Sequence, residues 1–304
     1  MIVFAVSVGS SYMRKRFSLI PYLLILPALL TLLFLFVYPI LWNGYISLHN
    51  VQFTTFNKDW SFTGLQNYLS LIHDSIFPFK FYKSLLVSLQ FVIGSVAGQF
   101  FLGLATALAL NSIVRARSAF RTLITFPWIL SELVVAYIWL YLYQPSGAIN
   151  NLIAILGIPG VRWLSNPHTA IWALVITNIW FGTPFSMLML GTALTTINPE
   201  IKEASRVDGA SSWQTFRWIV WPLIAPFAAL NLILITMCTT NLFALPLALT
   251  KGGPVYATTT TSLYMYRFAF EFGNFSVGSS LGVMLFLFNL VAAAFYLKTL
   301  GGPQ

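Results

Sequence analysis

Charged side chains are scarce in this sequence. Of 304 residues, 16 are basic and 7 are acidic, which is 8% of the chain, whereas 58% are hydrophobic. A soluble domain carries about 25% charged residues, so these few charges cannot solvate the surface of a globular protein of this length. Together with a mean hydropathy of +0.80, this indicates an integral membrane protein without a sizeable soluble domain.

Several kinds of site are excluded by what is missing. Cys238 is the only cysteine, so no intrachain disulfide can form, and the three histidines lie too far apart for a metal site. No G-x-x-x-x-G-K-[ST] phosphate loop is present, so the chain cannot hydrolyse ATP itself. The formal net charge of +9 comes from basic residues that lie singly or in short groups beside apolar runs. In that position they indicate membrane topology, so we do not expect a nucleic-acid partner.

Long stretches without charge predict six membrane spans, because an ionisable side chain near the bilayer centre costs a few kcal/mol. We expect an all-α polytopic protein with a cytoplasmic N-terminal segment at 1–18, a six-helix domain at 19–300 that includes a cytoplasmic loop at 198–217, and a tail at 301–304. The predicted spans are 19–42, 84–110, 122–143, 169–192, 218–249 and 277–297.

The basic residues of the loops predict the orientation. With a cytoplasmic amino terminus, six basic residues lie outside and the other ten inside, so we expect both termini in the cytoplasm. The outside residues are Lys58, Lys80, Lys83, Arg162, Lys251 and Arg267. The first span is too long for a signal peptide and lacks an A-x-A-like cleavage site, so we interpret it as an anchor. Either Met1 or Met13 could be the native start, since Met13 directly precedes a basic cluster.

The loop between the fourth and fifth spans is predicted to be a folded helix-turn-helix. Asn198 can cap a helix that starts at Pro199, and residues 208–209 (Asp-Gly) can end it. Ser211 or Ser212 can then cap a second helix. An alternative is a loop that lies on lipid headgroups, but its three acidic and three basic residues favour a protein partner.

This loop resembles the EAA loop of permease subunits in binding-protein-dependent ABC importers. The matching residues are Glu203-Ala204-Ser205, Asp208-Gly209-Ala210, Phe216, Ile219, Pro222 and Pro226. Four further stretches resemble the MalF-like branch of carbohydrate permeases. These stretches are residues 38–40, 62–68, 147–150 and 249–254.

The resemblance implies a type I ABC importer permease fold and a set of partners. These are a second, MalG-like permease subunit, two ATPase subunits that bind ATP and Mg, and an extracellular or periplasmic solute-binding protein. No cofactor is implied for this chain. The residues implied to contact an ATPase subunit are Glu203, Ala204, Asp208, Gly209 and Ala210, with Glu203 and Gly209 at the centre of the contact.

Glu132 is the only carboxylate inside a predicted span. Such a group usually faces the bundle interior or a water-filled cavity, and Trp128 precedes it by four residues, so both should share one face of a continuous helix. An aromatic ring beside a carboxylate suits a sugar, which has an apolar face and a hydroxyl edge. The alternative is a structural glutamate that is protonated or paired with another span.

Two further groups are candidates for substrate binding. Asn178, Gly182 and Phe185 recur at spacings of four and three, so they share one helical face, and the resemblance places the last two in the same cavity as Trp128 and Glu132. The fifth span carries a polar patch, although threonines in membrane helices often bond to their own backbone. This patch consists of Thr236, Thr239, Thr240 and Asn241.

We therefore expect a permease subunit that imports a mono-, di- or oligosaccharide. An importer of a non-sugar polar solute is one alternative. An ion-coupled secondary transporter is another, with Glu132 as its ion carrier, but it would need an inverted repeat that the sequence does not show. A membrane enzyme would need convergent acid-base or metal ligands, which are absent from the sequence.

Overall fold

The computed structural model describes residues 20–56, 60–73, 81–112 and 116–301. The predicted segment at 1–18, both candidate start methionines and most of the predicted tail at 301–304 therefore lie outside the described residues. The chain divides into two units, 1–42 and 43–304, which we describe separately.

The first unit is helical throughout its described part. It holds α1 (Ile20–Leu32), the π-helical turn η1 (Leu33–Val37) and the beginning of α2 (Tyr38–Ser47). Residues 22–47 are long and apolar enough to cross a membrane, and their large apolar side chains are mostly exposed. A helix of this kind requires lipid or another subunit as its surroundings.

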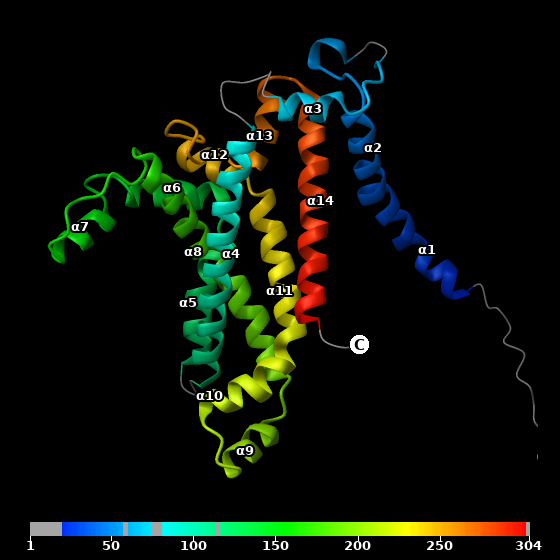
Figure 1. Ribbon diagram of the computed structural model, residues 1–304. Helices are drawn as coiled ribbons and strands as arrows, with labels where there is room; N and C mark the ends of the chain where they lie inside the picture. Colours follow the sequence, from blue (N-terminus) through cyan, green and yellow to red (C-terminus); the bar gives the residue numbers. More distant parts are fainter. Residues whose placement is uncertain (1–19, 57–59, 74–80, 113–115, 302–304) are drawn as a thin grey trace, which may run out of the picture. The chain divides into compact units, whose positions relative to one another are not determined.

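The second unit contains the remaining spans (Figure 1). Those that are continuous helices are α4 (Phe81–Ser112), α8 (Pro167–Thr195), α10 to α11 (Ser212–Asn241) and α14 (Phe275–Leu300). A bent pair, α5 (Arg117–Ile129) and α6 (Glu132–Leu142), qualifies as one broken span. With the span of the first unit, the described residues thus offer six candidate spans, and the predicted all-α polytopic fold is confirmed.

The third span differs from its prediction as one continuous helix. Leu130 and Ser131 adopt extended backbone conformations between α5 and α6, and the two helices meet at an angle of 99°. Ser131 and Glu132 are the polar residues at this break, but residues 122–143 as a whole are still apolar enough for one span, so mean hydropathy alone does not show the bend. The new helix begins at Glu132, where a carboxylate is favoured by the positive end of the helix dipole.

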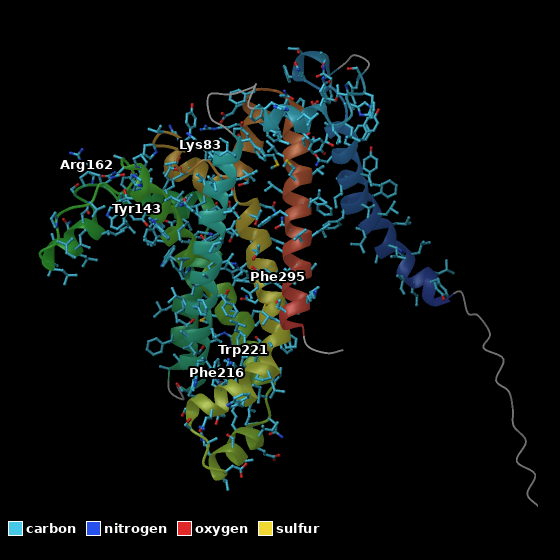
Figure 2. All side chains as sticks on the ribbon, viewed as in Figure 1. Lys83, Tyr143, Arg162, Phe216, Trp221 and Phe295 are labelled. Carbon is cyan, nitrogen blue, oxygen red and sulfur yellow. The ribbon has the colours of Figure 1, made fainter. Side chains whose placement is uncertain are left out.

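The fifth span also ends earlier than predicted. Helix α11 (Trp221–Asn241) stops at an extended Leu242, and α12 (Ala244–Thr250) follows as a separate short helix. At the other end of α11, a π-helical turn η3 (Phe216–Val220) joins it to α10 (Ser212–Thr215). The rings of Phe216 and Trp221 flank this turn, with centroids 6.3 Å apart (Figure 2).

The main core lies between α4, α8 and α11. Small residues bring the first two helices together: a Cβ at Gly98 would overlap Ile179, and a Cβ at Gly103 would overlap Ser186. Close packing at small residues is the expected means of helix association in membranes. The buried apolar residues of this core include Val96, Phe100, Leu104, Met187, Leu190, Leu194, Ile224 and Ala228.

Short helices cover the two ends of the second unit. Figure 1 shows α9 (Pro199–Val207) and α10 at one end of α11, and α12 and α13 (Thr261–Tyr266) at the other. The other short elements are η2 (Phe53–Thr55), α3 (Gln66–Ile72), α7 (Ala148–Ile155) and the π-helical turn η4 (Arg267–Glu271).

Candidate functional site

A cavity of about 260 Å³ lies between α4, α8, α11 and the broken span α5–α6. It is lined by Gln99, Trp128, Glu132, Asn178, Phe181, Gly182, Phe185, Ile235, Cys238, Thr239 and Leu242. Both interrupted spans reach it, because Glu132 begins α6 and Leu242 follows the end of α11. Irregular backbone at membrane depth is tolerated where it is buried in protein or lines a water-filled cavity.

Trp128 and Glu132 both line the cavity, but they come from two helices. The expectation that they share one helical face was wrong, because α5 ends at Ile129. The indole of Trp128 packs against the ring of Phe185, with centroids 5.7 Å apart. Glu132 is half-buried, and no described basic residue pairs with its carboxylate. The break thus places an aromatic pair and an unpaired carboxylate around one space.

The fourth span forms one wall of the cavity, where Asn178, Gly182 and Phe185 share the helical face that their spacing predicted. Gln99 on α4 was not predicted to line the cavity; it is buried and donates a hydrogen bond from Nε2 to the backbone oxygen of Asn178 at 3.0 Å. A Cβ at Gly182 would overlap the Gln99 carboxamide. A polar residue inside a charge-free span was the signal that could have revealed Gln99.

Of the four polar residues predicted in the fifth span, the structure places only Thr239 in this cavity. Its Oγ1 accepts a long hydrogen bond of 3.4 Å from Asn178 Nδ2. Thr236 instead hydrogen-bonds the hydroxyl of Tyr296 at 3.2 Å, and Asn241 donates to a backbone oxygen of its own helix. Thr240 faces a different, largely apolar cavity of about 240 Å³.

The other lining residues that the sequence analysis missed are Phe181, Ile235, Cys238 and Leu242. Three of them are apolar, and an apolar residue at a cavity cannot be told from a core residue by sequence. Cys238 is exposed, and its position on α11 carries no sequence signal of its own.

The helix-turn-helix between α8 and α11 forms as predicted. Asn198 accepts a hydrogen bond from the amide of Glu200 at 3.1 Å, and α9 begins at Pro199. The turn passes through Gly209, whose φ is +79°, a backbone conformation that suits glycine. Ser211 then caps α10 by accepting from the amide of Gln214, and the Gln214 side chain accepts from the amide of Ser211.

The two short helices are joined by Ser205, which is buried and hydrogen-bonds the Thr215 hydroxyl at 3.0 Å. This contact gives Ser205 a structural role in the turn. Of the residues predicted to contact an ATPase, Ala210 is half-buried and the others are exposed, namely Glu203, Ala204, Asp208 and Gly209.

The same surface also exposes large apolar side chains. Val207 is 88% exposed and Trp213 is 67% exposed. A hollow of about 330 Å³ opens beside Gly209, between the turn and the first residues of the fifth span, including Trp218. Exposed apolar side chains around a hollow are typical of an interaction surface.

A helical membrane bundle in which two broken spans line a cavity is the arrangement of a transport pathway. Residues 99–297 match the family model of the binding-protein-dependent transport system inner membrane component. The chain therefore belongs to this family of membrane transport subunits.

Individual relatives match almost the whole chain. The trehalose/maltose transport system permease protein MalF of Thermococcus litoralis is 34% identical over 290 residues, which are 95% of this chain and 96% of the relative. The sulfoquinovosyl glycerol transport system permease protein SmoG of Agrobacterium fabrum is 31% identical over 282 residues, covering 92% and 90% of the two chains.

Among solved structures, a chain of a bacterial ABC transporter involved in the import of the acidic polysaccharide alginate has the same fold. It superposes with a TM-score of 0.74 over 92% of this chain and 94% of its own length, at 23% identity. The predicted type I ABC importer permease fold is thereby confirmed.

Proposed function

We propose that this chain forms half of the translocation path of an ABC importer for a mono-, di- or oligosaccharide. The observation that carries the proposal is the cavity in which the rings of Trp128 and Phe185 lie beside the carboxylate of Glu132. An aromatic surface can stack on the apolar face of a pyranose ring, while a carboxylate accepts charge-assisted hydrogen bonds from its hydroxyl groups.

Relatives with sugar substrates support this choice of solute. Besides the trehalose/maltose and sulfoquinovosyl glycerol permeases, a probable starch degradation products permease, AmyD of Thermoanaerobacterium thermosulfurigenes, is 30% identical over 269 residues, which are 88% of this chain and 88% of the relative. The lining residues of the cavity include one carboxylate and no basic side chain. We therefore expect a neutral sugar, because a phosphorylated one would be repelled by Glu132.

The energy for transport would come from partner subunits. A second, MalG-like permease would complete the path, two ATPase subunits would bind ATP and Mg, and a solute-binding protein would deliver the sugar from outside. The helix-turn-helix would then seat in an ATPase subunit, with Glu203 and Gly209 at the contact and Ala204, Asp208 and Ala210 around them. The exposed turn and the hollow beside Gly209 support this role.

This proposal would put residues 198–217 in the cytoplasm together with both termini, and the distribution of basic residues over the loops supports that orientation. Closure of the ATPase dimer would rock the spans so that the cavity opens alternately to the two sides. The chain itself supplies a path and a docking surface, and ATP hydrolysis takes place in its partners.

Reconstitution tests the proposal directly. The chain is purified with its partner subunits, placed in liposomes with the solute-binding protein, and assayed for ATP hydrolysis and uptake with a panel of neutral sugars. We expect one sugar to stimulate both activities. Glu132→Ala should lower uptake about tenfold or more, since a hydrogen bond to a charged group contributes about 1.5–3 kcal/mol, while the subunits still copurify.

Three outcomes would contradict the proposal. Normal sugar uptake by Glu132→Ala would remove the carboxylate from the substrate site. Stimulation by a non-sugar solute alone would change the class of substrate. Uptake by the purified chain alone, driven by a proton or sodium gradient, would make it an ion-coupled transporter.

A further inference from the structure

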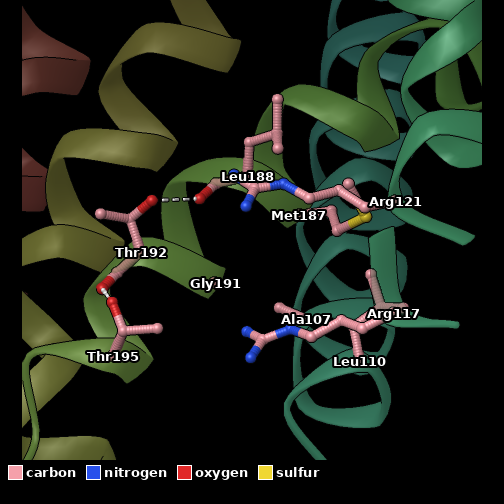
Figure 3. Close-up of a pocket in the computed structure, with 9 residues that line it drawn as sticks. All are labelled: Ala107, Leu110, Arg117, Arg121, Met187, Leu188, Gly191, Thr192 and Thr195. Atoms are coloured by element: carbon pink, nitrogen blue, oxygen red, sulfur yellow. Dashed lines mark hydrogen bonds between the residues drawn. The ribbon is translucent and has the colours of Figure 1, made fainter. Parts of the chain in front are cut away.

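Another, smaller cavity lies at the end of the bundle that carries α9 and α10. Its volume is about 90 Å³, and it is enclosed by the last turns of α4 and α8 and the first two turns of α5 (Figure 3). The lining residues are Ala107, Leu110, Arg117, Arg121, Met187, Leu188, Gly191, Thr192 and Thr195. None of them lines the cavity of about 260 Å³ that holds Trp128 and Glu132, which we call the transport cavity.

The charge of this cavity is entirely positive. Arg117 and Arg121 lie one turn apart on α5, and Figure 3 shows both guanidinium groups pointing from α5 toward α8. No carboxylate is among the described lining residues, and neither arginine has an ion pair or hydrogen bond within the described part of the chain. The ten guanidinium N–H donors, five on each arginine, therefore have no hydrogen-bond acceptor within the described part of the chain.

Arg117 is half-buried and Arg121 is exposed, and an anion between them would relieve the repulsion of their charges. Like charges four residues apart repel each other on a helix, and α5 begins at Arg117, so both charges also oppose the positive end of the helix dipole. The hydroxyl groups of Thr192 and Thr195 donate to backbone oxygens of their own helix, to Leu188 and Thr192 respectively. No described group in the cavity therefore neutralises the two arginines.

We propose that this cavity binds the phosphate group of an anionic phospholipid. Arginine forks match phosphate oxygens in pairs, and the small volume suits a phosphate group better than a sugar ring. The helix ends place the cavity where the hydrocarbon region gives way to headgroups. Basic pockets between spans at the cytoplasmic surface are known to bind such headgroups.

The neighbouring surface suits the rest of the lipid. Phe120 and Leu123 on α5 are 47% and 70% exposed, which offers apolar surface for acyl chains beside the arginines. At its other end the same helix carries Trp128 into the transport cavity. A lipid bound to Arg117 and Arg121 would thus fix α5 against α8 at the membrane surface, whatever solute is transported.

The test is a lipid titration of the purified full-length chain with its partner subunits. The delipidated complex is titrated in detergent with dioleoyl phosphatidylglycerol, with dioleoyl phosphatidylcholine of the same chain length, and with inorganic phosphate, and bound molecules are counted by native mass spectrometry. We expect tight binding of phosphatidylglycerol, retained at detergent concentrations that remove phosphatidylcholine.

Two variants remove the site in different ways. Arg117→Gln with Arg121→Gln removes its charge and should weaken phosphatidylglycerol binding by about tenfold or more. Gly191→Leu leaves both arginines in place and fills the cavity, since a Cβ at Gly191 already reaches 3.8 Å from Ala107 Cβ. Lys298→Gln is the matched control, an exposed basic residue in the last turn of α14 that lies outside the cavity, and it should bind the lipid normally.

Each alternative result overturns part of the proposal. Equal binding of phosphatidylglycerol by the wild type and the double variant would show that the cavity binds no anion. An equal loss of phosphatidylglycerol binding in Lys298→Gln would show that the lipid is held by general attraction to basic residues and not by this cavity. Displacement of the lipid by inorganic phosphate would make a free phosphate the ligand and would overturn the lipid assignment.

Discussion

The indole ring of Trp128 on α5 lies against the phenyl ring of Phe185 on α8, with centroids 5.7 Å apart and ring planes inclined by 45°. The pair stands beside the first residue of α6, Glu132, in the same cavity. The break after α5 makes this arrangement possible, because the chain bends by 99° between Ile129 and Glu132 and the carboxylate that begins α6 lines the same cavity as the two rings.

We expect Trp128→Ala to raise the sugar concentration needed for half-maximal uptake about tenfold, because stacking of a ligand ring on an indole contributes on the order of 1 kcal/mol beyond area burial. Trp128 is 46% exposed, so the substitution should leave folding intact. Uptake kinetics of the reconstituted complex measure the effect. Trp172→Ala is the control, a 55% exposed tryptophan on α8 outside the cavity. Equal effects of both substitutions would contradict the stacking role.

Gly182 on α8 and Gln99 on α4 lie in direct contact, because a Cβ at Gly182 would overlap the Gln99 side chain. We expect Gly182→Ala to destabilise the protein by about 1–3 kcal/mol, because the new methyl group overlaps the Gln99 carboxamide. Gln99→Ala in the same chain should restore much of that stability by making room. Thermal unfolding of the purified complex measures both variants, and Gly191→Ala is the control because its Cβ has ordinary contacts. Additive effects of the two substitutions would show that the side chains do not interact.

Cys238 offers a direct probe of the cavity because it is the only cysteine in the chain and lines the cavity wall. A small, water-soluble methanethiosulfonate reagent should modify it in the assembled complex, with Cys238→Ser as the unreactive control. The sugar that best stimulates ATP hydrolysis should slow modification severalfold when it occupies the cavity. Modification at the same rate with and without that sugar would place the sugar elsewhere.

Gly209 can be tested separately for its backbone and its surface role. Asparagine tolerates the left-handed conformation, and a Cβ at Gly209 meets nothing within 4 Å in this chain, so Gly209→Asn should preserve the turn. We nevertheless expect it to reduce ATP-driven uptake about tenfold or more, because the added side chain would hold an ATPase subunit away. Gly157→Asn is the matched control, since Gly157 has a φ of +74° and the same open surroundings. Unchanged uptake in Gly209→Asn would argue against a close contact there.

The features that were predicted correctly from the sequence depend on residues that are close together in the chain. Asn198, Pro199 and Ser211 occupy the capping positions expected of them, because a cap is a local hydrogen bond that residue type largely determines. Asn178 and Phe185 face one cavity because the helix period fixes which residues share a face. The number of spans followed from the cost of charge in a bilayer.

The features that the sequence did not predict depend on long-range packing. The breaks at Leu130 and Leu242 both have polar neighbours, but each lies within a stretch that is long and apolar enough to be predicted as one continuous span, so mean hydropathy does not show either break. The directions of Thr236 and Thr240 depend on which helices pack beside α11. Thr236 contacts Tyr296 and Thr240 faces the cavity of about 240 Å³, so neither lines the cavity that holds Glu132. A polar patch along a helix therefore does not show which space each of its side chains faces.

Asn150, in α7, makes several hydrogen bonds within the segment that follows the third span. Its side chain accepts hydrogen bonds from the amide of Val161 and from the Trp163 indole, and it donates to backbone oxygens including those of Gln144 and Val161. One buried amide thus holds together the two ends of the segment that contains α7.

We expect Asn150→Asp, which keeps the shape but loses the N–H donors, to reduce the free energy of local opening by about 2 kcal/mol or more, because each buried hydrogen bond contributes about 1 kcal/mol. Hydrogen exchange at the amide of Val161 should then be about thirtyfold faster. Asn151→Asp is the control, since this exposed neighbour makes only a long hydrogen bond of 3.3 Å to Ser146. Equal exchange in the two variants would mean that backbone contacts alone hold the segment. A change in global unfolding without faster exchange at Val161 would contradict this local role of Asn150.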